Sequence, residues 1–70
     1  MNHEKYRGFI LEAGANELQN DLGFSPKLTI IEDLGWAVDE TPIGIVRGLF
    51  DCRAKAIEAA LKFGRSIIDG

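Results

Sequence analysis

The most restrictive feature of the sequence is an uninterrupted stretch, residues 42–68, in which apolar side chains recur at helical spacing. Its only proline, Pro42, stands at the start, directly after Thr41, a residue type that caps helix N-termini. At about 100° per residue the apolar positions form two adjacent stripes and leave a narrow polar face. The pattern predicts one long C-terminal helix with apolar side chains on two of its sides.

The residues before this stretch predict two shorter helices. Apolar side chains at helical spacing favour a helix over 3–21, and Ser25-Pro26 marks the start of a second helix over 26–34. The β-branched side chains in this part of the chain also suit a strand, so a hairpin is the alternative for residues 27–38. The sequence therefore predicts an all-α fold and a single domain over 1–70, a small helical hairpin or three-helix domain that ends in a long helix.

The length of the last predicted helix implies a partner chain. At about 1.5 Å per residue it spans about 40 Å, more than the roughly 28 Å diameter of a compact domain of this size. A chain of 70 residues is marginally stable, and Cys52 is its only cysteine, so no disulfide within the chain can support it. We therefore expect a homodimer that covers the apolar overhang and completes the fold.

A second pattern in the long stretch places a small residue at every fourth position. A row with this spacing lets two backbones approach closely. We predict that the row forms a close contact, either with the first predicted helix or with a second copy of the chain. The predicted interface consists of this row and four larger apolar side chains: Gly44, Gly48, Cys52, Ala56, Ala60, Gly64, Ile45, Leu49, Phe63 and Trp36.

Trp36 has two interpretations. It lies in an apolar step of the connection that precedes the long stretch. We predict that it folds over the start of the predicted helix, onto Ile43 or Val46. The alternative is an exposed aromatic anchor for a partner, because tryptophan is enriched at the hot spots of protein interfaces.

Arg53 is the one charged residue that breaks the pattern of the long stretch, because it lies between the two apolar stripes. An arginine in apolar surroundings needs anionic or hydrogen-bonding partners. We predict a salt bridge to a carboxylate such as Glu12 or Glu17. The alternative is a site for a small anionic ligand, lined by Arg53 together with Arg47 or Arg65.

Neither catalysis nor metal binding is indicated by the sequence. Cys52 has no histidine near it to act as a base, and Cys52 and His3 are too far apart in sequence to predict a metal site. A net charge of −3, with alternating signs along the polar face, argues against a nucleic-acid partner. We expect no enzyme activity, no cofactor and no metal.

The remaining hypothesis is a binding protein. No apolar run approaches the roughly 20 residues of a membrane span, and the polar N-terminus leads into no signal-peptide core, so we expect a cytoplasmic location. We expect a protein–protein interaction module of the adaptor or inhibitor type that acts as a homodimer. The alternative is an oligomer that binds a small anionic ligand through arginines of the long helix.

Overall fold

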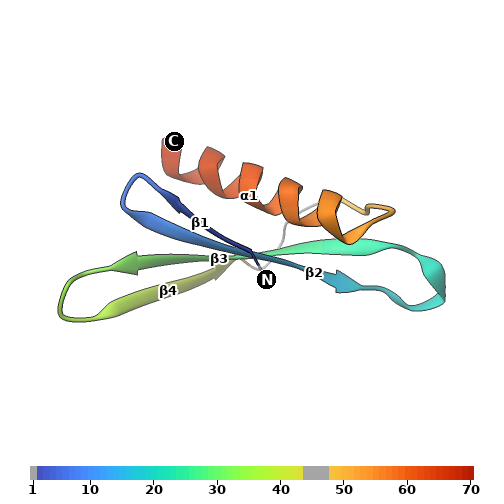
Figure 1. Cartoon of the computed structure of the whole chain (residues 1–70), viewed down its shortest axis with the longest axis horizontal. Helices are drawn as coiled ribbons and strands as arrows, with labels where there is room; N and C mark the ends of the chain where they lie inside the picture. Colours follow the sequence, from blue (N-terminus) through green and yellow to red (C-terminus); the bar gives the residue numbers. More distant parts are fainter. Residues whose placement is uncertain (1, 44–47) are drawn as a thin grey trace.

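The computed structural model describes residues 2–43 and 48–70, and its architecture is a β-sheet with one C-terminal helix on it (Figure 1). The strands form a single antiparallel sheet in the order β1-β2-β3-β4, so each strand pairs with the next one along the chain. The elements are β1 (Asn2–Tyr6), β2 (Phe9–Glu17), the 3-10 helix η1 (Gln19–Asp21), β3 (Phe24–Asp33), β4 (Val38–Ile43) and α1 (Arg53–Asp69).

The predicted all-α fold is wrong, and so is the description of the chain as helical. Residues 3–21 and 26–34, expected as α-helices, lie mostly in β1, β2 and β3, with residues 19–21 in the 3-10 helix η1. Pro26 does not begin a helix but lies inside β3, and among the described residues the pairing of β3 with β4 starts beyond it, at Leu28. Proline is tolerated in strands at positions where a ladder partner is missing on one side. The hairpin alternative for residues 27–38 is the one that the structure shows.

Two short turns connect neighbouring strands, one between β1 and β2 and the other between β3 and β4. Arg7 and Gly8 join β1 to β2 with φ angles of 49° and 83°, the positive values that a two-residue type I′ turn requires. Residues 34–37 join β3 to β4, and there the Leu34 N–H donates to the Ala37 carbonyl at 2.8 Å. The Gly35 N–H also donates to the Asp33 carboxylate at 2.8 Å. Both turns are therefore locally specified.

The hydrophobic core lies between α1 and one face of the sheet. Leu11 and Ala13 from β2 and Leu28 and Ile30 from β3 are buried there. The helix contributes side chains of minimal size, which lets its backbone lie close to the strands. The buried helical residues are Ala56, Ala60 and Gly64, the last three members of the small-residue row. Ala60 belongs to the core cluster, and Gly64 lies against Leu11 and Leu28 of the sheet.

The predicted long helix is correct only in its second part. α1 begins at Arg53 and has 17 residues, which is about 26 Å. Pro42 and Ile43 belong to β4, and residues 44–47 lie outside the described residues. The overhang that motivated a dimer through this helix is therefore absent from α1. No helix in the described part of the chain is both long enough and apolar enough to cross a lipid bilayer.

A backbone bridge ties the segment before α1 to the start of β3. Phe24 and Phe50 exchange two hydrogen bonds, from the Phe24 N–H to the Phe50 carbonyl at 2.8 Å and from the Phe50 N–H to the Phe24 carbonyl at 3.0 Å. Gly23, directly before this bridge, has φ +109°. The bridge sets the point from which α1 turns back across the sheet.

Polar contacts attach the end of α1 to β1 and its turn. The Arg65 Nε donates to Glu4 Oε2 at 2.7 Å and its Nη2 donates to Glu4 Oε1 at 3.0 Å, a bidentate pair. The Tyr6 hydroxyl donates to the Asp69 carboxylate at 2.6 Å, and Arg7 lies 3.0 Å from the same carboxylate. The helix is thus held to an edge strand by side chains as well as by the core.

The Glu4–Arg65 pair predicts a specific dependence of stability on pH. The hydrogen bonds that Arg65 donates to the Glu4 carboxylate hold the pKa of Glu4 below the ordinary value of 4.5. A lowered folded-state pKa adds stability above the unfolded pKa, and this contribution is lost as the pH falls through the folded pKa. We expect Glu4→Gln to melt at a lower temperature than the wild type at neutral pH, with the difference vanishing under acid conditions.

The measurement is a thermal melt of both proteins at a series of decreasing pH values that starts at neutral pH and passes below the unfolded-state pKa of a glutamate. Glu17→Gln, at the exposed end of β2, is the control and should follow the wild-type curve. If the wild type and Glu4→Gln lose stability in parallel over the whole range, the pair does not stabilise the fold.

Candidate interaction surface

One face of the sheet is covered by no helix in the part of the chain that the structure describes, and we call its side chains the open face. Side chains alternate along a strand, so the neighbours of the core residues Leu11, Ala13, Leu28 and Ile30 point away from α1. Among the described elements, α1 is the helix that packs on the sheet, and it contacts β1, β2 and β3. The open face includes His3, Lys5, Ile10, Glu12, Lys27, Thr29, Ile31, Asp33, Val38, Glu40 and Pro42.

The centre of the open face is a row with one residue from each strand. Lys5 pairs with Ile10, Ile10 with Ile31, and Ile31 with Glu40 in the strand register. Lys5 and Glu40 are exposed, and the two isoleucines between them are half-buried. The row therefore has a cation on β1, an apolar centre on β2 and β3, and a carboxylate on β4.

A second row runs beside the first. It contains His3, Glu12, Thr29 and Pro42, again with one residue from each strand. The imidazole Nε2 of His3 lies 3.0 Å from Glu12 Oε2, a cross-strand contact on the surface. His3 is therefore part of the sheet surface. Thr29 presents a hydroxyl and a methyl group, so this row is more polar than the central one.

The turn between β3 and β4 presents large apolar side chains to solvent. Trp36 is 86% exposed, and Leu34 and Val38 beside it are 41% and 61% exposed. Figure 1 shows this hairpin reaching beyond the C-terminal end of α1. Trp36 therefore does not fold onto the start of the helix as we predicted. It lies at the tip of a hairpin that α1 does not cover.

The free edge of β4 is poorly suited to pairing with another strand. Pro42 has no N–H to donate, and Asp39 and Glu40 place two carboxylates on the same short strand. Charged residues and proline are the usual means by which edge strands avoid pairing with other chains. The open face and the hairpin tip are therefore better binding surfaces than this edge.

The predicted interface does not assemble into one surface. Ala56, Ala60 and Gly64 are buried within the chain, whereas Cys52 is a half-buried residue at the N-cap of α1. Gly48 and Leu49 are exposed in the segment before α1. Phe63 is 39% exposed on the outer side of α1, far in sequence from Trp36 at the hairpin tip. The other two predicted members, Gly44 and Ile45, lie outside the described residues.

Arg53 and Arg65, the two predicted arginines that the structure describes, lie apart from each other. The Arg53 Nη1 donates to the Ala15 carbonyl at 3.2 Å, and the guanidinium lies 5.2 Å from the centre of the Phe24 ring. This carbonyl and ring replace the expected salt bridge to Glu12 or Glu17. Arg65 binds Glu4 and sits about 18 Å further along the helix axis.

Arg47, the remaining member of the predicted anionic site, lies outside the described residues. Arg53 and Arg65 are the members that the structure places, and each already has a partner in the chain. A common ligand could not reach both from one position on α1.

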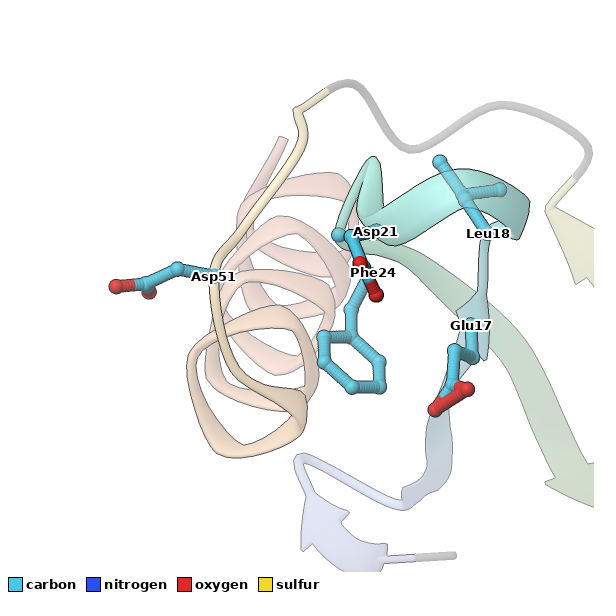
Figure 2. Close-up of a pocket in the computed structure, with 6 residues that line it drawn as sticks. Glu17, Leu18, Asp21, Phe24 and Asp51 are labelled. Atoms are coloured by element: carbon cyan, nitrogen blue, oxygen red, sulfur yellow. The ribbon is translucent and has the colours of Figure 1, made fainter.

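An acidic hollow lies beside the bridge that precedes α1. Glu17, Asp21 and Asp51 contribute to its lining, together with Phe24 (Figure 2). Asp51 points away from Phe24 and Glu17 in Figure 2, and its carboxylate lies 3.1 Å from the ammonium group of Lys55, which lowers the pKa of Asp51. No group of three acidic, histidine or cysteine side chains among the described residues is placed to hold a metal ion.

Comparisons with known proteins find no match. No protein-family model matches the sequence, and no curated protein and no solved structure matches it either. The function is therefore argued from the residues of this chain.

No residue of the open face was among the interface residues predicted from the sequence. Lys5, Ile10, Ile31 and Glu40 were not among the predicted interface residues, because the open face exists only once the strand register is known. The available signal was the alternation of polar and apolar residues from Lys27 to Ile30, which fits a strand with one buried face.

Proposed function

We propose that the protein is a binding module for other protein chains, of the adaptor or inhibitor type, and that it acts by binding and not by catalysis. One observation carries this proposal: Trp36 is 86% exposed at the tip of a hairpin that projects beyond the helix. Burying so large an aromatic side chain favours binding, and tryptophan is prominent among interface hot spots. The same hairpin also exposes Leu34 and Val38.

The local structure supports a preformed binding element. The Asp33 carboxylate and the Ala37 carbonyl hold the turn through hydrogen bonds to the backbone N–H groups of Gly35 and Leu34. A turn that is ordered before binding loses less conformational entropy when a partner arrives. We keep the cytoplasm as the proposed location and the homodimer as the proposed state, now formed through the sheet and not through the helix.

The experiment compares partner binding by the wild type and by Trp36→Ala. Proteins captured from cells by the immobilised wild-type chain are identified, and the leading candidate is purified and titrated calorimetrically against each variant. We expect Trp36→Ala to raise the dissociation constant by about thirtyfold, the size of effect typical of a hot-spot residue. Its melting temperature should be unchanged, because the side chain makes little contact with the fold.

Leu22→Ala is the matched control for the loss of an exposed apolar side chain. Leu22 is 63% exposed and follows η1, before β3, whereas Trp36 lies in the turn after β3. We expect this variant to bind the purified partner with wild-type affinity. Equal affinities of the wild type and Trp36→Ala for the purified partner would contradict the proposed role of the hairpin tip.

A further inference from the structure

We infer that the open face binds a second copy of this chain and that the two sheets pack face to face about a two-fold axis. The axis lies between the two sheets, runs parallel to the strands, and passes over the line midway between β2 and β3. This inference rests on the proposed function of a protein-binding module. It names the partner chain for one of the two candidate binding surfaces, the open face, while the hairpin tip stays free for another protein. The observation that carries it is the order of side chains in the central row, Lys5, Ile10, Ile31 and Glu40.

The central row is complementary to itself under this rotation. The rotation places β1 of one copy over β4 of the other, and β2 over β3. Lys5 then faces Glu40 of the second copy, and Ile10 faces Ile31 of the second copy. Each charge at the margin meets its opposite, and the apolar centre meets an apolar centre. Because the contact is isologous, each favourable pair occurs twice.

The other symmetric face-to-face arrangement brings like charges together. A two-fold axis perpendicular to the strands, through the central row, places each strand over its own copy. Lys5 would then face Lys5, and Glu40 would face Glu40. Like charges brought together at an interface are unfavourable. The charge pattern therefore selects the axis as well as the partner.

The packing that results is a sandwich with helices outside. Sheets in a sandwich lie about 10 Å apart, with side chains of the inner faces filling the space between them. The half-buried Ile10 and Ile31 would complete their burial there, while each α1 remains on the outer side of its sheet. Each sheet then has α1 on one face and the sheet of the second copy on the other, as in other layered domains.

The same geometry places the two hairpin tips together. A rotation about an axis parallel to the strands keeps both β3–β4 turns at one end of the dimer. Two copies of Trp36 would then be presented in the same direction, with the open faces already occupied. The dimer would offer a bivalent surface to the target of the proposed function, which increases avidity when both sites can be reached.

Charge reversal at Lys5 and Glu40 tests the inference. The sedimentation of wild type, Lys5→Glu and Glu40→Lys is measured as a function of concentration. We expect a dimer of the 7.7 kDa chain for the wild type and at least a roughly tenfold weaker association for each single variant. The reason is that each substitution places like charges against each other at two contacts.

Mixing the two variants makes the test specific for the axis. In an equimolar mixture of Lys5→Glu and Glu40→Lys, one chain carries two carboxylates and the other two lysines, so both contacts become attractive. We expect the mixture to dimerise, and we expect the double variant Lys5→Glu/Glu40→Lys to dimerise alone. Lys62→Glu, an exposed charge reversal on α1, is the control and should dimerise like the wild type.

Three results would overturn the inference: a wild type that stays monomeric, a dimer that tolerates both reversals, or single variants that fail to recover on mixing. A monomeric wild type whose partner binding still depends on Trp36 would end this inference and leave the proposed binding module intact. Conversely, recovery on mixing without any effect of Trp36→Ala on partner binding would support the dimer and contradict the hairpin site.

Discussion

Gly64→Leu is expected to lower the free energy of unfolding by about 3 kcal/mol, near the upper end of the range for overpacked cores. A Cβ atom at Gly64 would lie 3.0 Å and 3.1 Å from the two methyl carbons of Leu11, and 3.3 Å from a methyl carbon of Leu28. Leu11 is completely buried, so its side chain cannot move aside into solvent. The rest of the leucine side chain could fit only if α1 moved away from the sheet.

Urea denaturation of the wild type and Gly64→Leu measures this effect. Ser66→Leu is the matched control, because it adds the same side chain to an exposed position of the same helix. We expect the control to remain within about 0.5 kcal/mol of the wild type, as is usual for surface positions. If the two leucine variants unfold at the same urea concentration, α1 does not pack on the sheet through Gly64.

Gly23→Ala is expected to lower the free energy of unfolding by about 2–4 kcal/mol, from backbone strain and a disrupted backbone hydrogen bond. Gly23 has φ +109°, a value that L-residues rarely adopt, and its Cβ would lie 2.5 Å from the Phe50 carbonyl oxygen. That oxygen accepts the hydrogen bond from the Phe24 N–H. Relieving the clash therefore disturbs the bridge that positions α1.

Gly35→Ala separates the clash from the strain. Gly35 also has a positive φ, +87°, but a Cβ there would meet nothing within 4 Å. We expect it to cost about 1–2 kcal/mol, the cost of the left-handed conformation alone. Equal losses in the two alanine variants, measured by urea denaturation, would show that the contact between Gly23 and Phe50 does not matter for stability.

The strands were misread because apolar residues occur on both faces of the sheet. Ile10 and Ile31 lie on the open face, next to the core residues Leu11 and Ile30. Such adjacent pairs blur the alternation of period two and leave spacings that also fit a helix. The same isoleucines make the centre of the open face apolar, so the feature that concealed the strands also marks the proposed interface.

The helix was easier to predict from the sequence than the strands on which it packs. From residue 53 onward the small-residue row describes the buried face of α1 correctly, because the period of that face is unbroken. The prediction of apolar packing on a second side of the helix is not met, since Phe63 and Ile67 are exposed. The Glu4–Arg65 pair joins residues that are far apart in the chain, and only the strand order brings them together. Contacts of this kind follow from topology and cannot be read from local spacing.

Two surfaces of the chain are candidates for contact with a second copy in the proposed dimer. Phe63 and Ile67 on the outer side of α1 are 39% and 43% exposed and form the rival surface, since the sequence first suggested a dimer through the helix. The two surfaces differ in which side chains would meet across the dimer. This difference can be measured without changing the protein.

The most direct measurement is an isotope-filtered nuclear Overhauser experiment on a mixture of labelled and unlabelled wild-type chains, which detects contacts between copies only. The face-to-face dimer predicts contacts from the methyl groups of Ile10 in one copy to those of Ile31 in the other. Contacts between copies that involve only Phe63 and Ile67, or no contacts between copies at concentrations where the protein sediments as a dimer, would contradict it.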